Sequence, residues 1–376
     1  MNAFSKIAGS VTATAVLAAT PHHLPAFGDV PTLQYLGQWQ PGAATVGGTV
    51  VGGLSGISYD PQRNVYYTLS DDRSDPGKVR YYSVRLGLSD NGIDNGQIVS
   101  THVLLDRSGS PFGPHDLEAN PPTFAPDAEA IAFDSARQQV YWTSEGALTD
   151  GSDGRPAGLL DPWIRIAGLD GGYRGEFPLP PGFAFSAGQT SGPRPNGVLE
   201  GLSLTPDGRY LFAAMEGSLH QDGPTADEDR AGLVRITKFD VETRQAVAQY
   251  AYQVERAAPR TGFNGVSDIL ALSDSSLLVI ERAANLPEAV AVAVYRADVG
   301  SASDVSAVPS LSGQPVTPMP KSQAVDLNAV PGLRPLDNIE GITLGPVLPG
   351  GRQSVVMISD DNFQPFEVTQ FLAFAL

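Results

Sequence analysis

The sequence predicts an all-β fold, a single β-propeller that most simply has five blades. Short runs rich in Val, Tyr, Ile and Phe are bounded throughout by Gly, Pro, Asp and Asn, which is typical of strands and turns. A hairpin pattern also repeats five times. When positions 55, 129, 200, 268 and 340 are taken as equivalent, the steps between them are 74, 71, 68 and 72 residues. Repetition at a nearly fixed period is the signature of propellers and solenoids.

Each repeat opens with two strands joined by a turn such as 60–64 or 205–209, where Pro, Asp, Asn and Gly are concentrated. The five hairpins are predicted at 54–72, 128–145, 199–216, 267–281 and 339–361. Further strands are expected at 80–86, 99–105, 163–169, 233–240, 247–254 and 290–296. Residues 368–376 are too few to complete a blade, so we expect them to pair with 32–40 and close the ring. A six-bladed ring with one degenerate blade and a two-domain sandwich are the alternatives.

The N-terminus has the order of a secretory signal peptide, with Lys6 followed by a run of small and apolar residues from Ile7 to Ala19. We assign residues 1–25 to this signal, with cleavage between Ala18 and Pro25, and residues 30–376 to the propeller. A disordered tail is the alternative. No other segment has the 18 or more consecutive apolar residues of a membrane span. The expected product is a secreted or periplasmic protein, by default a monomer.

Composition narrows the possible partners and chemistry. The chain of 376 residues has 24 basic and 41 acidic side chains, a formal charge of −17, which disfavours nucleic acid and anionic membranes as ligands. It has no Cys, so thiol nucleophiles, zinc-thiolate sites and disulfides are excluded. There is no G-x-S-x-G elbow of a serine hydrolase and no H-E-x-x-H zinc motif.

Acidic residues recur at the two ends of the repeated hairpins. The first strand of a hairpin leads away from its start and the second returns beside it, so both ends lie on one face of the ring. The separation from Ser55 to Asp71, from Glu129 to Glu145 and from Glu200 to Glu216 is 16 residues in each case. The eleven acids predicted to gather there are Asp71, Asp72, Glu129, Glu145, Glu200, Glu216, Asp268, Glu281, Glu340, Asp360 and Asp361.

Crowded carboxylates repel one another unless cations or protons offset them, so the set predicts a metal site. Oxygen ligands and an exported protein favour Ca²⁺, with Mg²⁺ second. The competing interpretation is that these acids cap hydrated turns. Three further residues are candidates for catalysis on the same face, namely Arg73, Arg282 and His115. Arginine can hold a phosphate through two hydrogen bonds, although each could simply pair with a neighbouring acid, and His115 could be an ordinary loop residue.

At these positions the sequence resembles the secreted bacterial phytase-like family described as "esterase-like activity of phytase". The resemblance rests on 54–57, 70–73, 127–131, 200–203, 338–342 and 359–362, and it extends over roughly residues 50–375. It implies a propeller and a link to phosphoester hydrolysis, as in the calcium-dependent β-propeller phytases, which have six blades.

The leading hypothesis is a calcium-dependent phosphoesterase acting on a small anionic phosphomonoester, phosphodiester or phytate. In it the acids hold one or more cations, a cation-activated water attacks phosphorus, and Arg73 or Arg282 orients the ester. Two alternatives are a non-catalytic calcium-binding propeller that recruits a ligand or protein partner, and a carboxylesterase.

Overall fold

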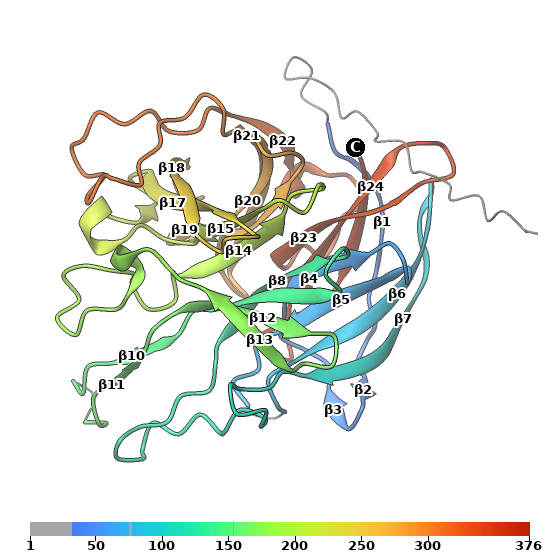
Figure 1. The fold of residues 1–376 in the computed structure, drawn as a ribbon. Coiled ribbons are helices and arrows are strands. Elements are labelled where there is room, and N and C mark those ends of the chain that lie inside the picture. The colour runs from blue at the N-terminus through green and yellow to red at the C-terminus, as the bar shows by residue number, and fades with distance from the viewer. Residues whose placement is uncertain (1–31, 75–76, 153) are drawn as a thin grey trace, which may run out of the picture.

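The computed structural model describes residues 32–74, 77–152 and 154–376. Within them the chain forms five antiparallel sheets of four or five strands, in which an innermost strand is followed outward by its neighbours (Figure 1). Blade one consists of β4 (Leu54–Asp60), β5 (Val65–Ser70), β6 (Arg80–Ser89) and β7 (Gly92–Val103). Blade two consists of β8 (Ala128–Asp134), β9 (Gln139–Ser144), β12 (Trp163–Gly168) and β13 (Tyr173–Phe177). Blade three consists of β14 (Leu199–Leu204), β15 (Tyr210–Met215), β17 (Gly232–Asp240) and β18 (Ala246–Val254).

The last two blades differ slightly from this plan. Blade four consists of β19 (Phe263–Ala271), β20 (Ser276–Asn285), β21 (Ala289–Asp298) and β22 (Lys321–Asp326), and the short β16 (Ala226–Asp227) pairs with the start of β19. Blade five consists of β23 (Asn338–Val347), β24 (Gln353–Asp360), β25 (Phe371–Ala375) and β1 (Gln34–Trp39). The predicted closure is therefore confirmed, because β1 pairs with β25 across the ends of the described chain.

The innermost strands form a closed ring. β4 packs against β8 and β23, and β14 and β19 complete the circle between them. Where two inner strands approach closely, a side chain does not fit. A Cβ on Gly56 would lie 2.6 Å from the carbonyl oxygen of Glu129, and one on Gly341 would lie 3.2 Å from the amide nitrogen of Ile57. Five blades, as predicted from the repeat, are thus accommodated around one axis.

The apolar core lies between neighbouring blades. Tyr67 and Leu69 of blade one pack with Ile131 and Trp142 of blade two. Similar clusters join blades two, three and four, blades four and five, and blades five and one. Because both faces of a blade are covered, the inner strands are buried along their length, as in β8. This explains why the sequence shows continuous apolar runs instead of strict alternation.

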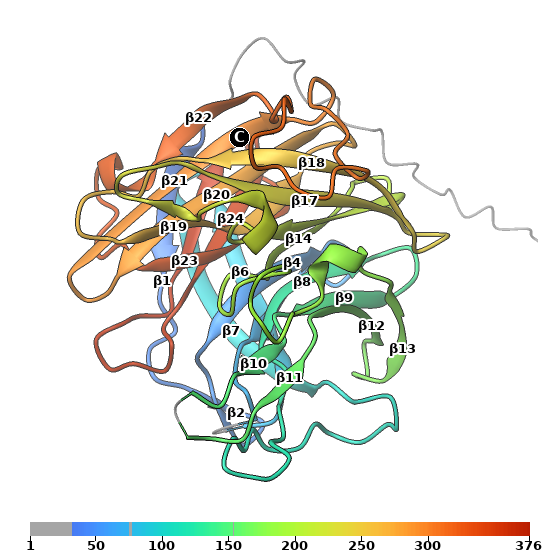
Figure 2. The same ribbon diagram turned by 90° about the vertical axis from the view of Figure 1, so that its left-hand side faces the viewer.

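Several short elements lie outside the blades. They are β2 (Thr45–Val46) paired with β3 (Thr49–Val50), β10 (Ala147–Thr149) paired with β11 (Gly158–Leu160), and the 3₁₀ turns η1 (Pro181–Phe183), η2 (His220–Asp222) and η3 (Leu327–Ala329). The β10–β11 hairpin extends to the left of the sheets in Figure 1 and toward the viewer in Figure 2. The described residues contain no helix with the length and apolar character needed to cross a membrane. The assigned signal peptide, residues 1–25, lies outside the described residues.

Candidate functional site

A polar cavity of about 390 Å³ opens where the inner strands begin. Carboxyl side chains from four of the five blades line it, together with two arginines and three asparagines. Its acidic lining residues are Asp71, Glu129, Glu145, Glu200, Glu216, Glu340, Asp360 and Glu367. Seven of the eleven predicted acids therefore meet in one cavity, and Glu367 joins them from the loop before β25.

The strand register explains how these side chains are aimed at the axis. Every inner hairpin shifts register near the predicted acidic position, for example between Leu199 and Gly201 and between Ile339 and Gly341. A β-bulge of this kind leaves an extra residue out of the ladder and redirects its side chain. The residues skipped in this way include Glu200 and Glu340, and Glu129 lies within the corresponding shift of β8.

Blade four departs from the acidic pattern. Its register shift falls between Val266 and Asp268, so the skipped residue is Ser267. On the returning strand, Val266 pairs with Glu281, and the next residue is Arg282. In blade one the equivalent pair is Leu54 with Ser70, and the next residue is Asp71. In blade three it is Leu199 with Met215, and the next residue is Glu216. Arg282 thus occupies the place that an acid holds in the other blades, and the predicted alignment of blade four was displaced by one residue.

The structure places Asp268 and Glu281 outside the cavity lining. The Asp268 carboxylate accepts hydrogen bonds from the amides of Leu202 at 3.2 Å and Ile342 at 2.8 Å, so it joins the inner strands of blades three, four and five. Glu281 accepts a hydrogen bond from the Tyr252 hydroxyl at 2.7 Å and forms an ion pair with Lys321. Both acids have internal partners and serve packing between strands.

Asp72 and Asp361 also lie outside the cavity lining. Asp72 forms a fully buried ion pair with Arg80, 2.5 Å between Oδ2 and Nη1. Asp361 accepts hydrogen bonds from the amide of Gly53 at 2.8 Å and from the Thr369 hydroxyl at 2.9 Å. The second acid of each Asp-Asp pair therefore fixes a loop, because successive residues at a strand end point in different directions.

The two predicted arginines both line the cavity. Arg282 lies between two acids, with Nη2 at 3.0 Å from Glu216 Oε1 and 3.1 Å from Glu340 Oε1, and its buried Nε has no hydrogen-bond partner. Arg73 is on the rim with 46% of its side chain exposed and forms an ion pair with Asp127. Each arginine is thus held by a carboxylate while part of its guanidinium faces the cavity.

His115 lines a smaller chamber next to the cavity. This chamber of about 110 Å³ shares Arg73, Glu145 and Asn196 with the acidic cavity. The buried Nδ1 of His115 has no hydrogen-bond partner. Burial, and then the charge of Arg73, lower the pKa of the His115 imidazole, so its neutral form is favoured.

Asp127 was missed among the candidate ligands. It precedes β8 and is 3% exposed, and its Oδ1 is buried without a hydrogen-bond partner. A signal was present in the sequence, since Asp127 lies two residues before Glu129 and alternate residues of an extended segment share a face. The site therefore contains an acid contributed by the approach to a strand as well as those at the bulges.

Burial dominates the electrostatics of the cavity. It raises the pKa of the Glu145 carboxyl to about 8, with further contributions from Asp127 and Glu216. It raises the pKa of Glu216 to about 7, although Arg282 opposes the shift. Burial and neighbouring carboxylates also raise the pKa of Glu129 and Glu200 well above the usual range. Without a cation, the cavity therefore favours protonated carboxyl groups.

Two groups of three carboxylates have the spacing of a metal site. Oxygens of Asp127, Glu129 and Glu145 lie within 4.8 Å of one another, and so do oxygens of Glu145, Glu200 and Glu216. Glu145 belongs to both groups. In addition, the buried Oδ1 of the cavity-lining Asn338 has no hydrogen-bond partner. Unpaired oxygen acceptors among carboxylates fit a hard cation such as Ca²⁺, which binds carboxylate and amide oxygens.

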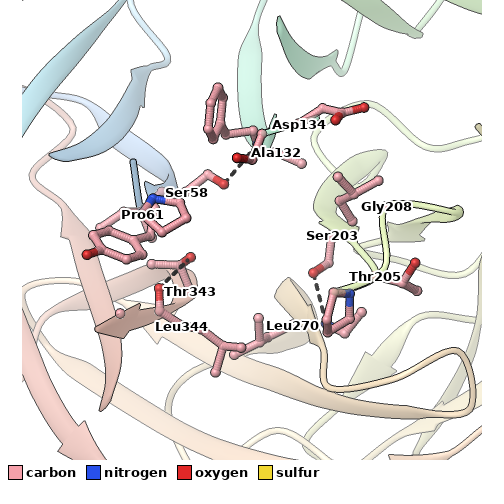
Figure 3. A pocket seen from close by; sticks show the side chains of 18 of the residues that line it. Ser58, Pro61, Ala132, Asp134, Ser203, Thr205, Gly208, Leu270, Thr343 and Leu344 are labelled. Carbon is pink, nitrogen blue, oxygen red and sulfur yellow. Dashed lines mark hydrogen bonds between the residues drawn. The ribbon is translucent and has the colours of Figure 1, made fainter. Parts of the chain in front are cut away.

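A second cavity lies at the opposite end of the inner hairpins and has a volume of about 690 Å³ (Figure 3). The turns after the inner strands surround its mouth, and Leu270 lies on its wall. Two of its hydroxyls are already engaged, because Ser58 accepts a hydrogen bond from Phe133 and Ser203 accepts one from Ala271. This end contains no cluster of carboxylates comparable to the acidic cavity among the described residues.

Two solved structures of low sequence identity resemble the chain. A xylan β-1,4-xylosidase from Bacillus halodurans C-125 has a TM-score of 0.45 and 12% identity, over 89% of this chain and 53% of the xylosidase. This chain therefore spans about half of that protein's length. The catalytic domain of a GH62 α-L-arabinofuranosidase from Coprinopsis cinerea has a TM-score of 0.44 and 9% identity, over 92% and 98% of the two chains.

The comparison with family models gives a more extensive match. No curated protein matches the chain. The family model described as "Phytase-like: Esterase-like activity of phytase" matches residues 49–363, a range that contains all five inner hairpins. This match covers more than half of the sequence, and it agrees with the resemblance found in the hairpin motifs. The chain therefore belongs to the phytase-like family.

Proposed function

We propose that this chain is an exported, calcium-dependent hydrolase of phosphate esters that acts in the acidic cavity. The observation that carries the proposal is the pair of carboxylate triads that share Glu145. Membership of the phytase-like family also favours a hydrolase. The residues fit a cation because the atoms that would bind it are all oxygen. In addition, buried oxygens of Asp127 and Asn338 have no hydrogen-bond partner.

The side chains divide into ligands and groups that contact the substrate. Asp127, Glu129, Glu145, Glu200 and Glu216 would hold the cation. A bound divalent cation would offset carboxylate charge, polarise a phosphoryl oxygen and lower the pKa of a water molecule. Arg282 would donate a hydrogen bond from its guanidinium to a phosphoryl oxygen in the cavity, and Arg73 would do so from the rim.

His115 is placed to act on the leaving group. It lies in the chamber beside Arg73 and Asp127, and its Nδ1 is free of other hydrogen bonds. A neutral imidazole can relay a proton between water and the departing oxygen. The role of Arg73 would then be to hold the ester at the boundary between the acidic cavity and the chamber.

Hydrolysis of p-nitrophenyl phosphate and bis-p-nitrophenyl phosphate tests the proposal. We expect activity with calcium on at least one substrate, its loss with chelator, and its recovery when calcium is restored. The double substitution Glu200→Gln and Glu340→Gln should abolish activity and weaken calcium binding. Well-folded, calcium-loaded protein that is inactive on both substrates would instead identify a non-catalytic calcium-binding propeller. Chelator-resistant hydrolysis of an acyl ester would identify a carboxylesterase.

A further inference from the structure

The chamber that holds His115 differs in character from the acidic cavity beside it. Its wall is less polar than that of the cavity, and Phe124, Phe185, Leu117 and Leu148 are among its lining residues. These side chains come from the loop before β8, the loop after β13 and strand β10. The chamber is thus a side pocket with a partly apolar wall, formed by long insertions outside the repeated blades.

The two spaces meet at the metal site. Arg73, Glu145 and Asn196 line both of them, and Asp127 of the first carboxylate triad lines the chamber. A ligand whose apolar part lies in the chamber would therefore have its polar end beside Glu145 and Arg73. The chamber volume of about 110 Å³ is of the same order as the roughly 150 Å³ apolar cavity that binds benzene in an engineered protein.

The charge of the cavity limits how many phosphates a ligand can carry. Eight carboxyl groups line the cavity, and its two arginines already form ion pairs with Glu216, Glu340 and Asp127. Each further phosphoryl group on a ligand would add negative charge to this acidic lining. The site therefore suits a ligand with a single phosphoryl group.

We propose that the substrate is a phosphate ester with one phosphoryl group and a compact aromatic organic group, and that the chamber is the subsite for this aromatic group. The proposal rests on the proposed function, since it assigns the two parts of one ester to the two adjoining spaces. His115, which contacts Phe124 edge-on at 5.9 Å between ring centroids, then lies beside the ester oxygen. A polyphosphorylated ring such as phytate does not meet these requirements.

Binding of two phosphonates tests the subsite without the complication of leaving-group reactivity. Phenylphosphonate and methylphosphonate have the same charged head and differ in the ring, so their affinities are compared by calorimetry on calcium-loaded protein. Burial of the ring should make phenylphosphonate bind about tenfold more tightly. Phytate should bind more weakly than phenylphosphonate.

Variants that fill the chamber should remove this preference. Ala147→Leu adds volume from β10, and Leu117→Phe does so from the opposite loop, in case the first variant fails to fold. Each should weaken phenylphosphonate binding about tenfold and leave methylphosphonate binding unchanged. Leu159→Phe is the matched control, because Leu159 pairs with Leu148 across the same hairpin but is 45% exposed and does not line the chamber.

The outcomes separate the two proposals. Equal affinity for both phosphonates, or tighter binding of phytate than of phenylphosphonate, would overturn the aromatic subsite and leave the phosphoesterase intact. Absence of binding by any of the three ligands, with calcium present, would overturn the proposed function and the subsite with it. A ring preference that survives both filling variants would show that another surface binds the ring.

Discussion

Glu145 has the most connected position in the site. It belongs to both carboxylate triads, it lines both the acidic cavity and the chamber, and its Oε1 accepts a hydrogen bond from the amide of Val198 at 2.6 Å. The backbone amide fixes the carboxylate from one side while its neighbours approach from the other. A single residue thus couples the two halves of the proposed metal site.

Replacing Glu145 with Gln should lower calcium affinity at least tenfold, because both triads lose a charged ligand. Calorimetric titration of chelator-treated protein measures the effect. Glu242→Gln is the control, since Glu242 is 84% exposed at the side chain and pairs with Arg137 away from the cavity. Calcium affinity that is unchanged in Glu145→Gln would contradict the assignment of this residue as a ligand.

The raised pKa values predict that metal-free protein loses stability as the pH rises. A carboxyl group with a pKa of about 8 when folded and about 4.5 when unfolded holds its proton more tightly in the folded state. Its contribution to stability is complete below about pH 4.5 and is lost as the pH rises through about 8. Glu216, with a pKa of about 7, acts in the same direction.

Thermal unfolding between pH 5 and pH 9 measures this dependence. With chelator, the midpoint should fall as the pH rises. With calcium, the fall should be abolished or reversed, because cation binding favours the charged carboxylates. A metal-free midpoint that rises steadily toward pH 9 would show that the cavity acids are already charged and compensated.

At the scale of single elements, the bulged inner hairpin is the unit that builds the site. The same bulge places Glu200 and Glu340 in the cavity, whereas in blade four the bulge residue is Ser267 and Arg282 stands at the place of the returning-strand acids Glu216 and Asp360. Asp268 then takes the position of Gly56, Gly201 and Gly341, next to the neighbouring inner strands. A shift of one residue therefore changes an acid from a candidate ligand to a bridge between strands.

Asp268→Asn should destabilise the protein without changing calcium affinity. The carboxylate accepts hydrogen bonds from three backbone amides, and an Asn side chain would present an NH₂ group to at least one of them. A loss of about 1–3 kcal/mol in the free energy of unfolding is expected. Denaturant unfolding and calorimetric titration measure the two quantities. A tenfold loss of calcium affinity in Asp268→Asn would restore this residue to the site.

At the scale of the whole molecule, ring closure determines the integrity of blade five. Gln34–Trp39 covers β25 as its outer neighbour, with Trp39 opposite Phe371 and Tyr35 opposite Phe374. These aromatic pairs lie 5.3 Å and 5.5 Å apart between ring centroids. Pairing of distant segments thus removes an exposed strand edge and adds aromatic packing at the seam.

A chain that begins at residue 41 should aggregate and unfold at a lower temperature than one that begins at residue 31. The shorter chain lacks β1 and exposes the edge of the apolar strand Phe371–Ala375, whereas the control keeps β1. Thermal unfolding and light scattering measure the difference. Equal melting temperatures and two monodisperse monomers would show that β1 contributes little to closure.

Much of the fold could be predicted because its information is local and repeated. Turn residues mark every inner hairpin, and the spacing of the hairpins indicates five blades. The site was predictable to the extent that it follows the same repeat, as for Glu129 with Glu145 and Glu200 with Glu216. The register of blade four was not predictable, since Arg282 does not resemble the acids at its counterparts, and Asp268 stands one residue after the bulge.

By itself the sequence determined an all-β ring, its closure by the chain ends, and the gathering of acids on one face. These follow from periodicity, because strands of one repeat must occupy equivalent places around an axis. The tertiary structure decided which acids face the cavity, that Asp127 joins them, and that a partly apolar chamber adjoins the carboxylate triads. These features depend on β-bulges and on contacts between loops that are far apart in sequence. A shift of one residue in the strand register reverses the direction in which a side chain points.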